Sequence, residues 1–146
     1  MNRIIRFSAS DNEFRQQSRR IRFQVFVEEQ HVPEELEYDE FEDVAVHYLA
    51  FQDTLAVATC RWRHTGKGIK LERFAVLNDH RGQGIGEQLV KRVLEEVVPL
   101  QKTVYLHAQE QVTGFYEKLG FVPSGPAFDE AGIRHFFMQY KPGSGE

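Results

Sequence analysis

The first half of the chain alternates between strand-like and helix-like spacing of its hydrophobic residues. The apolar run at residues 4–9 predicts a first strand, and Asp11, a favourable N-cap, predicts that a helix with one apolar face follows. A polar stretch then extends to about residue 44. The apolar run at 46–63 predicts two strands that are joined by a turn at Asp53 and Thr54.

The second half has a clearer pattern, which fixes most of the expected architecture. It predicts a strand at 69–77, a helix at 85–97, a strand at 103–108, a helix at 111–121 and a strand at 133–140. The helix at 85–97 is the clearest, because Ile85, Leu89, Val93 and Val97 recur every four residues. An extra short strand at 121–124 stays open. This order predicts an α/β protein with helices packed on a mixed sheet.

Length and composition narrow the class of protein. The 146 residues suit a single domain, which we place at residues 1–141 with a disordered tail at 142–146. A formal net charge of −4 argues against nonspecific nucleic-acid binding. The single cysteine, Cys60, excludes an internal disulfide framework, and no pair of cysteines indicates a metal site. No apolar run has the length of a signal peptide core or a membrane span, so we expect a cytoplasmic protein without membrane contact.

A glycine-rich stretch, RGQGIG at Arg81–Gly86, lies between the strand at 69–77 and the helix at 85–97. The N-terminus of a helix offers unpaired N–H groups and a partial positive charge, and glycine lets the backbone approach a phosphate closely. The stretch matches neither the GxGxxG dinucleotide fingerprint nor the Walker A loop. On the local pattern alone, an anion site and a simple tight turn both stay open.

Two longer stretches resemble the GNAT superfamily of N-acetyltransferases. LERFAVLNDHRGQGIGEQLVKRVL at residues 71–94 resembles motif A of this superfamily, whose core is matched by Arg81, Gly84 and Gly86. FYEKLGFV at residues 115–122 resembles its second signature. The resemblance covers roughly residues 46–140. It implies a mixed, mostly antiparallel sheet of six or seven strands, flanked by helices, with a splayed strand pair that holds acyl-coenzyme A. The segment 20–40 looks like a subgroup of small bacterial proteins with undefined substrates.

The resemblance implies acetyl-coenzyme A (acetyl-CoA) as cosubstrate, and no metal. Backbone N–H groups of the glycine loop would hold its pyrophosphate, with Arg81 adding positive charge. The pantetheine arm would pair with the strand before the loop, and a backbone N–H near Val76 would stabilise negative charge on the thioester oxygen. Gln109 stands where the family often has an asparagine. The implied cofactor-binding residues are Phe74, Ala75, Val76, Arg81, Gly82, Gln83, Gly84, Ile85, Gly86 and Gln109.

Three side chains are candidates for the chemistry. Tyr116, in the second signature, resembles the family's general acid, although helical periodicity alone makes it a core tyrosine. Glu72 is the candidate general base, and partial burial would raise its pKa; the alternative is an ion pair with Arg73 or Arg61. His107 is a second candidate base or a substrate-binding residue, and the alternative for it is a hydrogen-bonded core histidine.

Neither signature identifies the residues that bind the acceptor, so we look for them in an acidic segment outside both signatures. Residues 23–60 contain no lysine or arginine and ten acidic residues, among them Glu28 and Glu29, which we predict to bind substrate. Such a wall would attract a cationic amine, on a small molecule or a peptide. A solvated loop is the alternative, and arginines of the first helix, including Arg22, would neutralise the acidic charge if they paired with it. A homodimer is also left open by the resemblance.

Two other functions stay open. A noncatalytic coenzyme A sensor or interaction domain would keep Arg81–Gly86 and would not need Tyr116. An acyl-homoserine-lactone synthase has a related fold. Synthases of this class are expected to take their acyl group from acyl-carrier protein and to lack an intact pyrophosphate loop, so the RGQGIG sequence argues against this reading.

Overall fold

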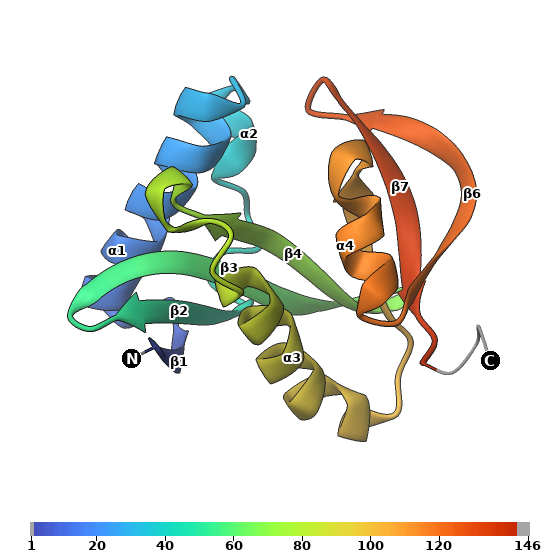
Figure 1. Cartoon of the computed structure of the whole chain (residues 1–146), viewed down its shortest axis with the longest axis horizontal. Coiled ribbons are helices and arrows are strands. Elements are labelled where there is room, and N and C mark those ends of the chain that lie inside the picture. The colour runs from blue at the N-terminus through green and yellow to red at the C-terminus, as the bar shows by residue number, and fades with distance from the viewer. Residues whose placement is uncertain (1, 143–146) are drawn as a thin grey trace.

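Seven strands form one sheet at the centre of the protein (Figure 1). The computed structural model describes residues 2–142. The strands are β1 (Asn2–Ser8), β2 (Val46–Gln52), β3 (Leu55–Thr65), β4 (Gly68–Val76), β5 (Val104–Gln109), β6 (Phe121–Glu130) and β7 (Ile133–Tyr140). Their order across the sheet is β1-β2-β3-β4-β5-β7-β6, in which β4 and β5 run parallel and the other neighbours run antiparallel.

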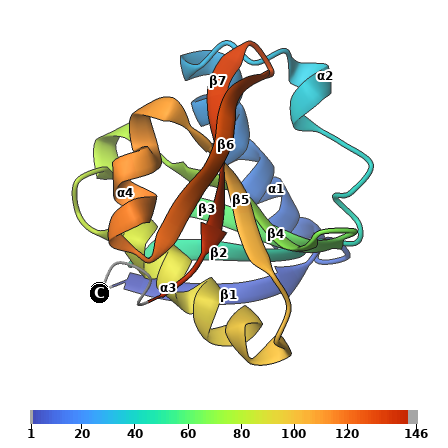
Figure 2. The same ribbon diagram turned by 90° about the vertical axis from the view of Figure 1, so that its right-hand side faces the viewer.

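Helices cover both faces of this sheet (Figure 2). One face carries α1 (Asn12–Arg22), its continuation as a π-helix, η1 (Phe23–Glu29), and the single turn α2 (Glu34–Glu37). The opposite face carries α3 (Ile85–Val97) and α4 (Thr113–Lys118). Short 3₁₀ turns connect elements at η2 (Asn78–His80), η3 (Val98–Leu100) and η4 (Glu110–Val112).

Each face of the sheet buries its own hydrophobic core. The larger core packs α3 and α4 against inward residues of the central strands, and it includes Leu89, Leu71 and Leu106. The smaller core packs Ile21 of α1 and Val25 of η1 against Leu49 and Ala75. The sheet therefore separates two compartments, and a side chain's place in the alternation of its strand decides which compartment it faces.

The parallel pair β4–β5 is short and then opens. The two strands pair only from Ile69 to Leu71, opposite Val104 to Leu106. Beyond that point β4 continues beside β3 to Val76, and β5 continues beside β7 to Gln109. At the closed end the backbones lie close, since the N–H of Ile69 donates to the carbonyl of Thr103 at 2.7 Å. The result is a splayed strand pair, as the resemblance implied.

The structure confirms the predicted fold, a mixed and mostly antiparallel sheet flanked by helices. Asp11 caps α1, because its side chain accepts a hydrogen bond from the N–H of Phe14 at 3.2 Å. Two features differ from the predicted pattern. The extra strand is ten residues long rather than four, because β6 resumes its pairing with β7 after a bulge between Ser124 and Phe128. The polar stretch after α1 contains η1 and α2.

Within residues 2–142, no helix has the length and apolarity needed to cross a bilayer. In the same part of the chain, no group of three or more histidine, cysteine or acidic side chains is arranged to hold a metal ion. Apart from Pro142, the predicted tail lies outside the described residues.

Candidate active site

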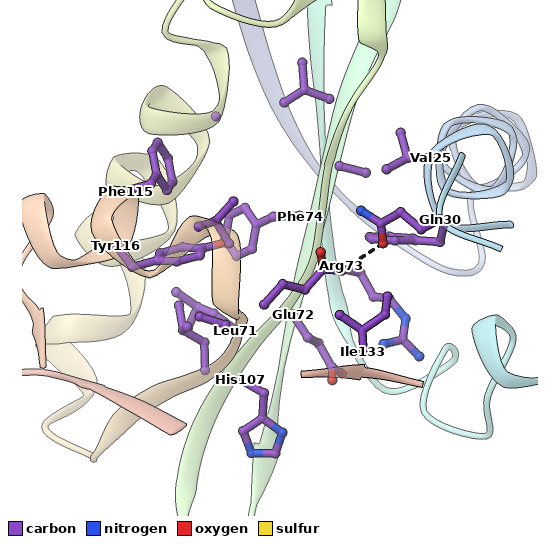
Figure 3. Close-up of a pocket in the computed structure, with 18 of the residues that line it drawn as sticks. Val25, Gln30, Leu71, Glu72, Arg73, Phe74, His107, Phe115, Tyr116 and Ile133 are labelled. Carbon is purple, nitrogen blue, oxygen red and sulfur yellow. Dashed lines mark hydrogen bonds between the residues drawn. The ribbon is translucent and has the colours of Figure 1, made fainter. Parts of the chain in front are cut away.

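A cavity of about 830 Å³ lies where β4 and β5 separate. Its walls come from both strands, from the start of α3, from α4, and from η1 and the segment after it. Figure 3 shows Phe115 and Tyr116 on one side of β4 and Val25 and Gln30 on the other. The cavity therefore connects the two compartments that the rest of the sheet separates.

The glycine loop forms one end of this cavity. Gly82 and Gly84 have φ values of 78° and 80°, a region that favours glycine, and Gly84 is the N-cap of α3. The first turn of α3 starts with the bond from the N–H of Gln88 to the carbonyl of Gly84, at 3.1 Å. Within residues 2–142, no backbone carbonyl accepts from the N–H groups of residues 82–87. The loop thus presents a row of free donors at the positive end of a 13-residue helix, which suits an anion.

Arg81 lies at the rim of this loop and is already bound to other residues. Its Nε donates to the carbonyl of Val76 at 2.8 Å, and its two terminal nitrogens donate to the carboxylate oxygens of Glu29, both at 2.9 Å. Arg81 is 40% exposed and Glu29 is 36% exposed. The guanidinium therefore stands beside the loop, as predicted, but a phosphate there would have to compete with Glu29.

The open edge of β4 offers the backbone groups that a strand-like ligand needs. The N–H of Leu77, just after β4, donates to the carbonyl of Val57 in β3, at 2.9 Å. Because peptide groups alternate along a strand, the N–H and carbonyl of Phe74 and Val76 point the other way, into the gap. Arg81 donates to the carbonyl of Val76. The groups that a ligand could still use are therefore the N–H of Val76 and the N–H and carbonyl of Phe74.

Tyr116 lies on the α4 side of the gap. It is 8% exposed, it lines the cavity, and its ring packs edge-on against Phe74 at 6.2 Å and against Phe121 at 5.8 Å. Burial raises the pKa of its hydroxyl well above the usual value, and the nearby Cys60 thiol adds to this effect. Tyr116 is therefore protonated at neutral pH and can donate a proton. Tyr116 is thus a residue of the larger core, as helical periodicity predicts, and it also lines the cavity.

Glu72 lies on the opposite face, the side of α1 and α2. Its carboxylate is 2.8 Å from Arg61, 2.7 Å from Arg63 and 3.4 Å from Lys70. Burial acts to raise the pKa of Glu72, but the charges of Arg61, Lys70 and Arg73 and the hydrogen bond from Arg63 outweigh burial and lower it. The rise that we expected from burial alone is therefore wrong, because the sequence did not show how many cations converge on this carboxylate.

His107 faces the same compartment as Glu72. Its Nδ1 is 3.0 Å from Oε1 of Glu130, and within residues 2–142 no hydrogen bond involves its Nε2. The hydrogen bond with His107 lowers the pKa of Glu130 to about 2, with further lowering by the charges of Lys70 and His135. Because Glu130 is ionised and can only accept, the hydrogen of this contact belongs to Nδ1 of His107.

The remaining predicted site residues lie at the edge of the cavity or outside it. Gln109 lines the cavity, and its Nε2 donates to Oε1 of Gln30 at 2.8 Å, so β5 is joined to the segment after η1. Gln83 does not line the cavity; its side chain accepts a hydrogen bond from Gln52. Glu28 is exposed and also lies outside the lining, while Glu29 reaches the rim through Arg81.

Part of the acidic segment is paired with arginines, namely Glu37, Asp39 and Glu42. Arg22 contacts Glu37 and Glu42, and Arg61 contacts Asp39 and Glu42. Arg73 contacts Glu37 and Asp39 at 3.2 and 3.3 Å. Arg22 and Arg61 are 1% and 0% exposed. The acidic residues that reach the cavity, Glu37 and Asp39, therefore carry little uncompensated negative charge.

Several cavity residues were absent from the expectations. The strand alternation itself contained the signal for two of them, Arg63 and Lys70, because Arg61 and Arg63, and likewise Lys70 and Glu72, occupy alternate positions of two predicted strands. Charges at alternate positions of central strands indicate a polar compartment on one face of the sheet. Glu130 and Gln30 gave no such signal, since only the tertiary fold brings them to His107 and Gln109.

Comparison with known proteins gives a consistent result. A family model described as an acetyltransferase (GNAT) domain matches residues 8–142. The uncharacterised protein YyaT of Bacillus subtilis is 41% identical over 123 residues, which cover 82% of this chain and 83% of YyaT. Protein ElaA of Escherichia coli is 31% identical over 124 residues, 81% of each chain. The crystal structure of Escherichia coli ElaA has a TM-score of 0.86 and covers 97% of this chain and 100% of that chain.

Two further structures place the fold among acyltransferases. An acyl-CoA N-acyltransferase from Pseudomonas aeruginosa has a TM-score of 0.85 at 27% identity, covering 95% of this chain and 99% of that chain. A CoA-dependent acyl-homoserine lactone synthase, BjaI, has a TM-score of 0.74 at 20% identity, covering 97% of this chain and 84% of that chain, which shows the shared fold alone. BjaI is described as CoA-dependent, so the expectation that synthases of this class take their acyl group from acyl-carrier protein does not hold for BjaI.

Proposed function

Because this chain belongs to the GNAT acetyltransferase family, we propose that it transfers an acetyl group from acetyl-CoA to the amine of a small molecule or peptide. The observation that carries this proposal is the continuity of the cavity. It runs from the free N–H groups at the start of α3, along the open edge of β4, to a second compartment on the other face of the sheet. One elongated ligand and one acceptor can therefore meet in the gap between β4 and β5.

The residues present fit acetyl-CoA. The free N–H groups at residues 82–87 suit a pyrophosphate, and the unpaired edge from Phe74 to Val76 suits the amides of a pantetheine arm. Beyond the last pair, Leu71 with Leu106, β4 continues for five residues, or about 16 Å at the rise of a strand. The N–H of Val76 would donate to the thioester oxygen while negative charge develops on it.

Tyr116 and a base on the other face would divide the proton transfers between them. The thioester supplies an activated acyl group, and in the transfer a C–N bond forms at the acceptor as the C–S bond breaks. Tyr116 donates its hydroxyl proton to the departing sulfur. Its raised pKa makes it a weak acid, so proton donation has to accompany cleavage of the C–S bond rather than precede it.

Two residues are candidates for the base that takes the proton from the amine. Glu72 remains our sequence prediction, and it is ionised, but its lowered pKa makes it a weak base. His107 has Nε2 free and its Nδ1 held by Glu130, an arrangement that fixes one tautomer. Both face the compartment opposite Tyr116, where the acceptor would enter.

Thiol release from acetyl-CoA, measured with a panel of primary amines, tests the proposal, with mass spectrometry of the product. We expect an N-acetyl product, and a loss of about 100-fold in Tyr116→Phe with coenzyme A binding retained. Tight coenzyme A binding, no thiol release with any amine and no effect of Tyr116→Phe would instead support the noncatalytic sensor. S-adenosylmethionine belongs in the panel, because a lactone product would support the synthase alternative.

Cytoplasmic location and homodimer formation stay predictions.

A further inference from the structure

Two cations of the acceptor compartment share one carboxylate. Arg63 on β3 and Lys70 on β4 are direct partners in the sheet. Both contact Glu72, which also contacts Arg61. Arg61 has Asp39 and Glu42 as additional partners. Within residues 2–142, neither Arg63 nor Lys70 has a second carboxylate within 4 Å. Positive charge is therefore in local excess at this pair.

The donors of this pair are largely unused, although both side chains are mostly buried. The side chains of Arg63 and Lys70 are 15% and 13% exposed, and both residues line the cavity. Arg63 donates through Nε to Glu72, and its guanidinium lies 3.7 Å from the centre of the Phe41 ring. In the described chain, its terminal nitrogens and the ammonium of Lys70 make no hydrogen bond. Buried cations with free donors favour an anionic ligand.

The other groups that face Lys70 do not remove this excess. Glu130 on β6 interacts electrostatically with Lys70. Its carboxylate, however, is 3.0 Å from His107 and lies beyond ion-pair distance of Lys70. His135 on β7 also faces Glu130, at 3.8 Å. The carboxylate of Glu130 thus contacts two histidines. The carboxylate of Glu72 is shared by Lys70, Arg63 and Arg61.

We propose that the acceptor carries a carboxylate as well as its amine, and that Lys70 and Arg63 bind this carboxylate. The inference rests on the proposed acetyl transfer and names the class of its acceptor. Lys70 precedes Val76, whose N–H would hold the thioester oxygen, by six residues on β4, or about 20 Å along the strand, and its side chain shortens this span. The amine and the carboxylate are therefore separated by several bonds, as in an ω-amino acid rather than an α-amino acid.

The test compares ω-amino acids of four to eight carbons with their primary amides, which keep the amine and lose the charge. We expect kcat/KM, from thiol release with acetyl-CoA, to favour the acid at least tenfold at one chain length. This ratio should fall toward one in Lys70→Met and in Arg63→Met, and Lys70→Arg should retain most of it. Lys67→Met is the matched control, because Lys67 is an exposed lysine of the same hairpin outside the cavity lining, and its ratio should equal that of the wild type.

Binding of the same compounds to the protein with coenzyme A, followed by calorimetry, separates the two proposals. Turnover that favours the amides, or an acid preference that survives both methionine variants, overturns the carboxylate site and leaves acetyl transfer standing. Acid binding that requires Lys70, without thiol release from any amine, overturns acetyl transfer and keeps the site. An aminoalkyl phosphate of equal length that binds better than every acid would show that the cations recognise phosphate, and would also overturn the proposal.

Discussion

The guanidinium of Arg81 holds the carboxylate of Glu29 through two hydrogen bonds of 2.9 Å. This contact joins the glycine loop to the end of η1, and it occupies the cation that we expect to approach a phosphate. The ion pair therefore acts against cofactor binding as long as it persists. Its partial exposure keeps the energy of this opposition small.

We expect Glu29→Gln to strengthen coenzyme A binding about twofold to fivefold, because the variant releases Arg81 for the phosphates. Isothermal calorimetry at low ionic strength measures the change, which should shrink as salt is added. Glu28→Gln is the matched control, since Glu28 is exposed and outside the cavity lining. Weaker binding in Glu29→Gln would mean that Glu29 positions Arg81 for the phosphates rather than competing with them.

The charge of the glycine loop can be tested separately from its shape. Gly84 has a φ of 80°, and a side chain placed there would meet no atom within 4 Å. Aspartate and asparagine both tolerate this backbone region better than most residues, and they have nearly the same shape. We expect Gly84→Asp to weaken coenzyme A binding at least tenfold more than Gly84→Asn, because the carboxylate would face the phosphates. Equal affinities for the two variants would place the pyrophosphate elsewhere.

The pH dependence of kcat/KM distinguishes the two candidate bases. The pKa of Glu72 is lowered, so Glu72 stays deprotonated from pH 8 down to pH 5 and would produce no loss of rate in that range. A histidine base would produce an acid limb there, since imidazole ordinarily titrates near pH 6.5. The charges that face His107 are Glu130, His135 and Lys70.

We expect His107→Gln to lose about 100-fold in kcat/KM and to remove the acid limb, with coenzyme A affinity unchanged. The same acceptor is used for both proteins, so its own ionisation cancels from the comparison. Glu130→Gln should also lower kcat/KM, because the variant removes the carboxylate that holds Nδ1 of His107 at 3.0 Å. If Glu72→Gln removes activity at unchanged stability while His107→Gln does not, Glu72 is the base.

The closed end of the splayed strands depends on a single glycine. A Cβ at Gly68 would lie 2.2 Å from the carbonyl oxygen of Thr103, and the φ of Gly68 is 137°. We expect Gly68→Ala to destabilise the fold by about 3 kcal/mol, because the alanine would push β4 and β5 apart. Gly66→Ala is the control, since a Cβ there meets nothing within 4 Å and the backbone is unstrained. Urea unfolding measures both; a similar loss in the two variants would exclude this explanation.

The sequence was sufficient for the features that depend on local pattern. Periodicity located α3, alternation located the central strands, and the glycines marked the start of a helix with free donors. It named Arg61 as a possible partner of Glu72, and the structure shows this ion pair. It could not reveal the partner of Arg81, which lies 52 residues away in the chain. The acidic segment shows the same limit. Its composition suggested a negative wall, whereas arginines from β3, β4 and α1 pair with Glu37, Asp39 and Glu42 in the fold.

The end of η1 contacts both sides of the gap through two consecutive residues. Glu29 binds Arg81 beside the glycine loop, and Gln30 binds Gln109 on β5. A ligand that draws Arg81 away from Glu29 therefore also frees one end of the segment that covers the acceptor compartment. Occupancy of the two compartments is then thermodynamically linked, and each ligand changes the affinity of the other by the same factor.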